Sequence, residues 1–453
     1  MRPLALALTA VTAVACGADP GDAGDGDAGA VDAGGDAGAP GGPTRYPADV
    51  IRSPVTEAVA ARLRAIATGG DSPRADVFLK AGASGTVSTH LLYCLAGPAH
   101  RPQYTIDLDG RDHLLPTLAH FRAGRIGTTT PFDRATLAAE IGRTARWVLT
   151  GAPSPLEQEL AAATPRFAFV NYGTNDMGAA ASYGAALVPF WDAMNELLDR
   201  LEAEGVVTIV TGLNPRSDRA DAARWVPTWD AVTRALAEAR QLPYISLYVA
   251  AAPLPELGLV ADGLHGNVFS DGTAEPCVFD AAGLAFNYNV RNLASLETLH
   301  DVRRVVLDGA AAPDVAPLPP VAGAGTAADP FVIDRLPFTH TFTTTGGERM
   351  RDGYPDCDAG QDERGPEITY RLDLPAAAPV RAVVLDRAGV DVDLHVLTGG
   401  VCAERSDRLV DRALAAGAHQ LVVDTFTSAG VEQAGAYTLV VLPCEPGDPD
   451  CAP

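Results

Sequence analysis

Three short polar stretches could together carry out acyl-transfer chemistry. Asp262 precedes His265 by three residues, a spacing at which a carboxylate can accept the Nδ1 hydrogen of the imidazole. The other ring nitrogen can then remove a proton from a hydroxyl group. Ser84 offers that hydroxyl, and Asn175 offers an amide donor for an oxyanion. The sequence therefore predicts a nucleophile, an oxyanion donor and a base in the order Ser84, Asn175, His265.

These stretches follow segments that are predicted to be buried β-strands. The period of the apolar residues predicts strands at 76–81, 167–172, 206–211 and 243–249, and helices at 86–95, 132–149, 183–204, 218–240 and 281–306. Strands that alternate with helices predict a parallel sheet covered on both faces. Because ligands bind beyond the carboxyl ends of parallel strands, the candidate residues fall on one edge of this sheet.

One helix start has an unusually complete signal. Ser154 is followed by Pro155 at the first helical position and by Glu157 at the third. Serine caps the free N–H groups, proline fits the first turn, and glutamate can return a bond to the cap. We therefore predict a helix that begins directly after Ser154.

The order of the motifs supports a specific mechanism. His265 would take the proton of Ser84 as Ser84 attacks a carbonyl carbon, and Asp262 would stabilise the imidazolium. Oxyanion donors would be the N–H of Ser84, the side chain of Asn175 and a loop N–H from residues 122–127. Taken singly, Ser84 could be part of a small-residue turn and Asn175 a loop residue. Their joint occurrence on one edge favours catalysis.

Residues from about 75 to 300 resemble the SGNH (or GDSL) hydrolase family. The Gly-x-Asn-Asp block of that family is matched at 173–176 and its Asp-x-x-His block at 262–265. Its nucleophile block is matched by Gly-Ala-Ser-Gly at 82–85. The resemblance implies a flavodoxin-like three-layer α/β/α sandwich, an exported serine esterase with Ser84, His265 and Asp262 as the triad, and no cofactor or metal.

Two features of the blocks stay open. The oxyanion glycine of the family is placed at Gly127, with Gly124 as the alternative. Ala83 replaces the usual aspartate of the nucleophile block, and Gly85 replaces an apolar residue. The alternative to an active enzyme is therefore a catalytically silent, surface-binding lipoprotein on the same fold. Substrates of an active enzyme could be acetylated polysaccharides, lipids or small esters.

The N-terminus predicts export. Arg2, an apolar stretch at 4–15 and the small residues at 13–15 form a signal peptide, and Cys16 follows it directly. This arrangement resembles a bacterial lipobox and implies lipidation of Cys16 and a membrane-anchored lipoprotein, with plain secretion as the alternative. Residues 17–48 are almost all Gly, Ala, Asp and Pro and are predicted to be a disordered tether.

Charge and cysteine content agree with an exported protein. The net charge of −23 disfavours nucleic-acid binding. Six cysteines besides Cys16 predict disulfides in an oxidising compartment, although sequence does not fix their connectivity. Cys444 with Cys451 would close a small loop. Cys94 with Cys277, and Cys357 with Cys402, would each stay within one domain.

The C-terminal part has a different pattern of apolar and polar residues. Short alternating strands are predicted at 338–343, 367–372, 380–385, 390–396, 420–425 and 436–442. This pattern predicts a small antiparallel β-sandwich. The motifs at 389–394 and 435–439 resemble the bacterial pre-peptidase C-terminal (PPC-like) domain. Calcium could use Asp391 and Asp393, or the acidic residues at 352, 356 and 358, but solvated carboxylates are the preferred interpretation.

Together these features predict a monomer with six segments. They are a signal peptide with the lipobox cysteine at 1–16, the tether at 17–48, an SGNH-like catalytic domain at 49–308, a Pro/Ala linker at 309–329, a PPC-like sandwich at 330–445 and a tail at 446–453.

Overall fold

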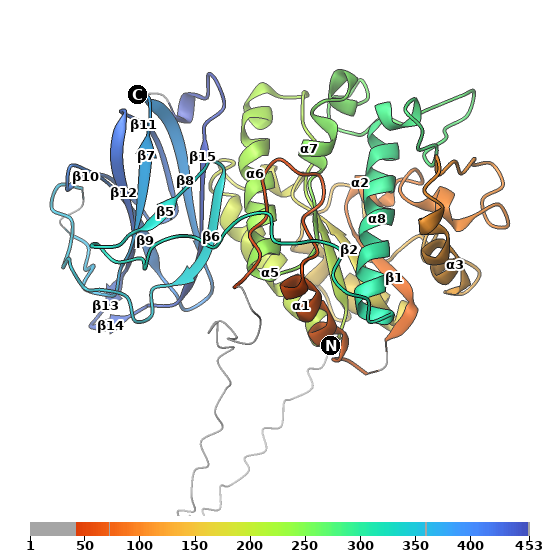
Figure 1. Cartoon of the computed structure of the whole chain (residues 1–453), viewed down its shortest axis with the longest axis horizontal. Coiled ribbons are helices and arrows are strands. Elements are labelled where there is room, and N and C mark those ends of the chain that lie inside the picture. The colour runs from red at the N-terminus through yellow and green to blue at the C-terminus, as the bar shows by residue number, and fades with distance from the viewer. Residues whose placement is uncertain (1–41, 72, 358–359, 452–453) are drawn as a thin grey trace, which may run out of the picture. The chain divides into compact units, whose positions relative to one another are not determined.

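The computed structural model describes residues 42–71, 73–357 and 360–451 (Figure 1). The signal peptide, Cys16 and the tether up to residue 41 lie outside the described residues, so those predictions stay predictions. Ordered packing begins earlier than the sequence suggested. Thr44, Arg45 and Tyr46 are buried, and the Tyr46 hydroxyl donates to the carbonyl of Leu242 at 2.9 Å. A tether that extends to residue 48 is therefore wrong, because an aromatic residue at 46 fills the core.

Helices and strands alternate over the first two thirds of the described chain. The helices are α1 (Glu57–Ala67), α2 (Ser84–Val87), α3 (Leu115–Ala123), α4 (Pro155–Ala163), α5 (Leu187–Ala203), α6 (Ala220–Ala239), α7 (Leu247–Ala251) and α8 (Asn287–Leu307). The strands are β1 (Arg74–Gly82), β2 (Pro165–Asn171), β3 (Val207–Thr211) and β4 (Tyr244–Ile245).

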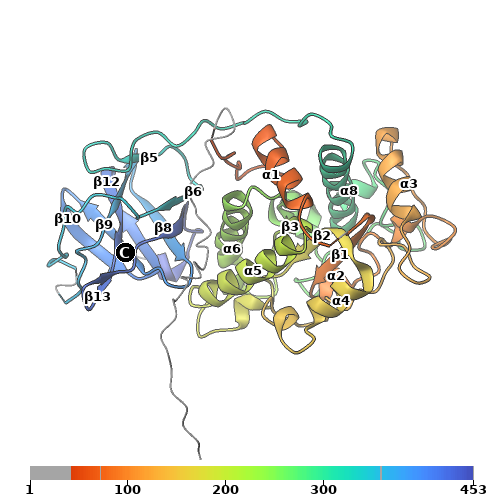
Figure 2. The ribbon, with the colours of Figure 1, turned by 90° about the horizontal axis from the view of Figure 1, so that it is seen from below.

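The four strands form a parallel sheet in the order β1-β2-β3-β4. A parallel bridge between Gly82 and Ala139 adds one more short segment beside β1. The strand order therefore reverses at β1, as it does in flavodoxin-like sheets. Figure 2 shows α1 and α8 on one face of the sheet and α4 and α5 on the other. The predicted three-layer α/β/α fold is confirmed.

Some predicted elements differ from the observed ones. Residues 132–149 are not a helix; only the 3₁₀ turn Trp147–Leu149 is helical there. Backbone groups of this segment bond elsewhere: the Phe132 carbonyl accepts from Lys80, and the Leu137 N–H donates to Glu159. Residues 243–249 are also not one strand, because β4 ends at Ile245 and Ser246 caps α7 through the N–H of Val249.

Two more differences concern short helices. The predicted helix at 86–95 is replaced by α2 and by the 3₁₀ turn Tyr93–Ala96, because Ser88 has an extended ψ of 131° that ends α2. Helix α1, which the apolar pattern did not reveal, begins after Thr56, whose side chain accepts from the N–H of Val59.

The C-terminal part is all β. Its strands are β5 (Phe331–Ile333), β6 (Phe338–Thr343), β7 (Ile368–Leu374), β8 (Ala378–Asp386), β9 (Val392–Thr398), β10 (Val401–Ser406), β11 (Leu409–Leu414), β12 (Gly417–Thr425), β13 (Thr427–Ser428), β14 (Val431–Glu432) and β15 (Ala436–Pro443). Two sheets, β10-β9-β12-β7-β5 and β11-β8-β15-β6, enclose an apolar core. The predicted β-sandwich is confirmed, although β5, β10, β11, β13 and β14 were not predicted.

Three disulfides join the cysteine pairs that the sequence favoured. They are Cys94–Cys277, Cys357–Cys402 and Cys444–Cys451. The last pair fixes the segment that was predicted to be a tail. Cys451 is buried, and Asp448 pairs with Arg381 at 3.1 Å. The chain is therefore packed up to Cys451.

Candidate active site

Ser84 is positioned by a sharp turn at the carboxyl end of β1. A Cβ atom at Gly82 would lie 2.1 Å from Thr86 Oγ1 and 2.7 Å from the Asn171 carbonyl, so only glycine fits there. The carbonyl of Ala83 accepts from the N–H groups of Thr86 and Val87. Ser84 is therefore the first residue of α2, where the backbone N–H points out of the helix.

Asp262 and His265 lie on a tight loop after α7. The loop is closed by the N–H of Val260, which donates to the His265 carbonyl at 2.9 Å. Gly263 has a φ of 68°, and a Cβ there would lie 2.6 Å from the N atom of Asp218. Glycine is thus required for this loop to lie against residues 217–218, which follow β3.

The structure brings the three predicted triad residues together. Nε2 of His265 lies 2.9 Å from Oγ of Ser84, and Nδ1 lies 2.7 Å from Oδ2 of Asp262. The N–H groups of Leu264 and His265 donate to the other oxygen of Asp262 at 2.9 and 3.0 Å. These distances suit proton transfer from serine to imidazole, with the carboxylate fixing the tautomer.

Hydrogen bonds keep the Asp262 carboxylate ionised. The backbone N–H of His265, its ring and the N–H of Leu264 lower the pKa of Asp262 to about 2. The side chains of Asp262 and His265 are 49% and 41% exposed. The imidazole therefore stays oriented while the site remains open to solvent.

The Gly-x-Asn-Asp block lies next to the same edge. The Asp176 carboxylate accepts from the N–H groups of Gly173 and Ala145 at 3.0 and 2.8 Å, so it holds the loop, and burial raises its pKa to about 6. The side-chain amide of Asn175 donates to the Arg143 carbonyl at 3.0 Å. An amide nitrogen carries two hydrogens, so this bond uses one of its two donors.

The structure places Gly127 and Gly124 away from Ser84. A Cβ at Gly124 would lie 2.0 Å from the carbonyl of Asp76, near the start of β1. Asp76 precedes Gly82 by six residues, or roughly 20 Å of strand. Gly127 is only three residues beyond Gly124. Placing the oxyanion glycine at Gly127 is therefore wrong, because the loop lies at the opposite end of the strand.

A different glycine lies on the catalytic edge. The Gly82 N–H donates to the Ala138 carbonyl, and the Glu140 N–H donates to the Gly82 carbonyl, at 3.1 and 3.3 Å. Gly142 follows this pair, has a φ of 80° and has open space around its Cβ position. Gly142 was missed because residues 132–149 were predicted to be helical. The turn-forming Gly142 itself was the signal against that helix.

Arg291 was also missed by sequence reasoning. It lies on α8, is buried and lines a cavity of about 30 Å³ beside Ser84 and His265. Its guanidinium donates to the Gly85 carbonyl at 3.4 Å and to Asn171 Oδ1 at 3.0 Å, while its Nε has no hydrogen-bond partner in the described part of the chain. Burial lowers the pKa of Arg291. Nothing in the local sequence marked this arginine, since only the packing of α8 brings it to the site.

Fold and site together define a serine hydrolase class: a parallel α/β sheet with a Ser–His–Asp arrangement at its switch point. Residues 110–268 match the model of the GDSL-like Lipase/Acylhydrolase family. This match contains the Gly-x-Asn-Asp and Asp-x-x-His blocks but begins after Ser84. It confirms the predicted resemblance to GDSL-type ester hydrolases. A search of curated proteins found no match.

Solved structures with a similar arrangement include several esterases. A two-domain esterase active on acetylated mannans is 12% identical, with 89% of this chain and 98% of that chain covered and a TM-score of 0.30. A GDSL-like lipase from Bacteroides thetaiotaomicron is 14% identical, with 53% and 98% covered and a TM-score of 0.31. The pre-peptidase C-terminal domain of a collagenase from Bacillus anthracis is 13% identical, with 23% and 89% covered and a TM-score of 0.16.

Proposed function

We propose that this chain hydrolyses acetyl esters on a carbohydrate polymer through a covalent acetyl-enzyme. The observation that carries the proposal is the pair of short contacts around His265, at 2.9 Å to Ser84 Oγ and 2.7 Å to Asp262 Oδ2. Ser84 attacks the ester carbonyl carbon as its proton moves to His265, and His265 then returns that proton to the departing sugar oxygen. A water molecule, which gives a proton to His265, then attacks the acetyl carbonyl carbon; the bond to Ser84 Oγ breaks, Oγ takes the proton back from His265, and acetate is released.

The size of the cavity favours a short acyl group. About 30 Å³ lies beside Ser84, and the residues that line it include Leu247 and Tyr288. A space of roughly 10–15 Å³ is needed for one water molecule, so this cavity suits a group of about the size of acetyl. We expect it to accommodate a long acyl chain poorly. The half-exposed Asp262 and His265 leave the outer side open for the polymer.

A matched set of esters tests this proposal. The wild type is expected to release acetate from acetylated mannan or xylan and to prefer 4-nitrophenyl acetate over the octanoate by at least about tenfold. Ser84→Ala should lose both activities and its labelling by a fluorophosphonate probe. Ser154→Ala, at the cap of α4, is a suitable control.

The rival function is a silent, surface-binding lipoprotein. Wild type and Ser84→Ala that behave alike, with no acetate released and no probe attached, would favour this rival. Preference for octanoate would instead keep the esterase chemistry and contradict the acetyl specificity. The two parts of the proposal can therefore fail separately.

We also propose that the protein is exported and anchored through a lipid on Cys16. Its support is the signal-like sequence before Cys16 and the use of the other six cysteines in disulfides. In the described part of the chain, no helix is both long and apolar enough to cross a bilayer. Cys16→Ser should move the protein from the membrane fraction to the soluble exported fraction, with its ester hydrolysis retained. Continued membrane association of that variant would contradict the anchor.

A further inference from the structure

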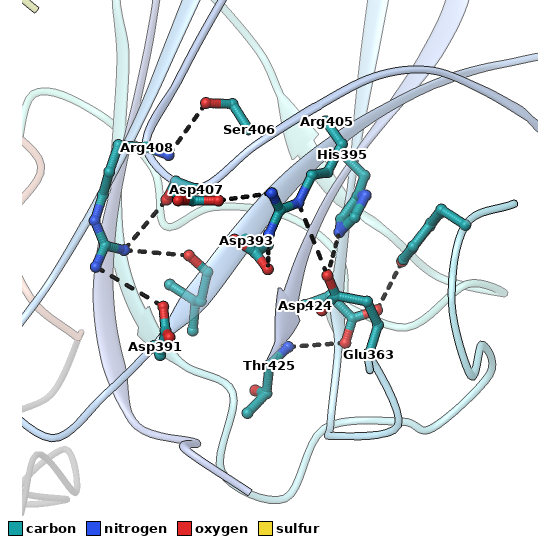
Figure 3. A network of polar contacts seen from close by, with 12 residues as sticks. Glu363, Asp391, Asp393, His395, Arg405, Ser406, Asp407, Arg408, Asp424 and Thr425 are labelled. Carbon is teal, nitrogen blue, oxygen red and sulfur yellow. Dashed lines mark hydrogen bonds and ion pairs between the residues drawn. The ribbon is translucent and has the colours of Figure 1, made fainter. Parts of the chain in front are cut away.

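The β-sandwich contains a second polar cluster, far in the sequence from the triad. Val392, Leu394 and Val396 of β9 point into the sandwich core, so Asp393 and His395 lie on the opposite face of that sheet. Residues 344–357 and 360–367, between β6 and β7, cover this face. They bring Glu363 against His395 and against Asp424 of β12 (Figure 3).

Three side chains of this cluster could share one ion. One carboxylate oxygen from each of Glu363 and Asp424 and one ring nitrogen of His395 all lie within 4.8 Å of one another. All three residues are at most 1% exposed. They are therefore out of reach of bulk water, which would otherwise solvate them.

The cluster leaves buried polar atoms without partners. Both carboxylate oxygens of Glu363 and both ring nitrogens of His395 have no hydrogen-bond partner among residues 42–71, 73–357 and 360–451. Asp424 is held in place, because the Tyr354 hydroxyl and the Thr425 N–H donate to its two oxygens at 2.7 and 2.8 Å. Buried polar atoms are nearly always satisfied in folded proteins, so these atoms point to a missing ligand.

The pairing of local charges also indicates a missing ligand. Arg405 pairs with Asp393 at 2.7 Å, and Arg351 pairs with Glu367 at 2.6 Å. Glu363 has only two long contacts, with the Nε2 atom of His395 at 3.7 Å and the Nε atom of Arg405 at 4.0 Å, and Asp424 forms no ion pair with the described residues. The two remaining carboxylates match the two positive charges of a divalent cation.

The ligand set selects among divalent cations. Nε2 of His395 lies 3.7 Å from Oε1 of Glu363, close to the ~3.4 Å that separates two ligands about 2.1 Å from a tetrahedral zinc ion. An imidazole with two carboxylates suits a first-row transition metal. Calcium takes six to eight oxygen ligands and rarely uses histidine.

We propose that Glu363, His395 and Asp424 bind one divalent transition-metal ion of the zinc type. The ion ties residues 344–357 and 360–367 to β9 and β12. Tyr354 supports the same contact, since its ring stacks on His395 at 3.6 Å between centroids. The Cys357–Cys402 disulfide fastens the same segment to β10. The role of the ion is to hold this segment on the sheet, separate from ester hydrolysis.

Zinc itself is the probe for the first experiment. Tag-free protein is treated with a chelator, incubated with Zn²⁺, passed through a desalting column and analysed for metal content and thermal unfolding. We expect one zinc per wild-type chain and a thermal midpoint raised by several degrees, and neither effect in Glu363→Gln/His395→Gln. His419→Gln is the matched control. His419 is buried on β12, but its ring nitrogens already contact Thr398 Oγ1 and the Ala415 carbonyl at 3.0 and 2.9 Å, so that variant should keep its zinc.

Several outcomes would overturn the site. They are a wild type that retains no zinc, equal zinc in wild type and double variant, or a midpoint raised by Ca²⁺ and not by Zn²⁺. Cobalt(II) gives a reading on the wild type alone, should the double variant fail to fold. With one water molecule as the fourth ligand, bound Co²⁺ should show the visible absorption of a four-coordinate site, and bound cobalt without these bands would contradict the proposed ligands.

Discussion

The catalytic site and the cluster in the β-sandwich each combine a histidine with carboxylates, yet their surroundings are opposite. The His265 side chain is 41% exposed, and both ring nitrogens have partners, Ser84 and Asp262. The His395 side chain is 1% exposed, and neither of its nitrogens has a partner among the described residues. The catalytic cluster is exposed to solvent and its histidine nitrogens are paired. The cluster in the β-sandwich is buried and its histidine nitrogens lack hydrogen-bond partners among the described residues.

This difference separates two uses of the same side chains. A histidine that moves protons must exchange them with water and must be oriented, so exposure and a fixed Nδ1 partner serve it. A buried histidine beside uncompensated carboxylates cannot be solvated, and such carboxylates are stabilised by an added positive charge, either a cation or a proton. The residue types alone do not distinguish these cases, and only exposure and partners do.

The largest expected effect is on the catalytic cluster of Ser84, His265 and Asp262. His265→Ala removes the proposed general base, so kcat should fall by about 10⁴-fold or more, with the far-ultraviolet circular dichroism and thermal midpoint little changed. Steady-state kinetics with 4-nitrophenyl acetate check this, with His419→Gln as the control that retains activity. A residual rate within about tenfold of the wild-type rate would contradict the proposed role of the exposed histidine, because His265 would then not be the general base.

A second prediction concerns Arg291, the buried cation beside the catalytic cluster. Arg291→Met removes the donors to the Gly85 carbonyl and to Asn171, so the turn that carries Ser84 should shift. A small misplacement of the nucleophile costs about 10- to 100-fold in kcat, with KM less affected. Arg291→Lys, which keeps one donor and the charge, should recover part of the rate. An increase in KM alone would show that Arg291 binds substrate and does not position Ser84.

Lys80 gives a test of buried charge within the α/β part. Its ammonium group donates to the Phe132 carbonyl at 2.8 Å and lies 4.5 Å from the centre of the Tyr93 ring. Burial lowers the pKa of Lys80 from 10.5 to about 7, and the charge of Asp133 opposes this shift. Between these values the unfolded chain binds more protons, so the free energy of unfolding increases with pH.

Urea unfolding of wild type and Lys80→Met at several pH values measures this effect. The wild type should gain stability relative to the variant as the pH rises from 7 to 9, by at most about 1.4 kcal/mol per pH unit. A constant difference across that range would show that the partners of Lys80 fully compensate its burial, which would sharpen the contrast with the unpartnered groups around His395.

The smallest expected effect lies outside both clusters. The Ser154 side chain accepts from the Glu157 N–H, and the Glu157 side chain accepts from the Ser154 N–H, so the predicted capping box is present at the start of α4. Ser154→Ala should lower the free energy of unfolding by about 1 kcal/mol and leave kcat unchanged. Denaturant melts and ester assays check both statements. A large loss of activity would mean that α4 helps to position the catalytic edge.

Elements with strong local sequence signals were predicted well. The strands around Phe78, Phe169 and Ile209 were found from continuous apolar runs. The motifs predicted that Ser84, Asp262 and His265 share one edge, and their side chains are within hydrogen-bond distance there. Local signals failed where distant groups satisfied the backbone. Residues near Phe132 had a helical apolar period, but Lys80 and Glu159 bind their backbone groups instead. The oxyanion glycine was misplaced for the same reason. The segment that pairs with Gly82 and contains Gly142 had been predicted to be part of a helix at 132–149.

The sequence by itself determined which residues can do chemistry and the α/β and all-β classes of the two parts, because strand periods, glycine turns and short motifs are properties of neighbouring residues. Only the tertiary structure decided that Gly142 and Arg291 lie at the catalytic edge and that Glu363, His395 and Asp424 meet in a dry space. Burial and the pairing of charges depend on chain segments that are far apart in sequence, so no local pattern encodes them.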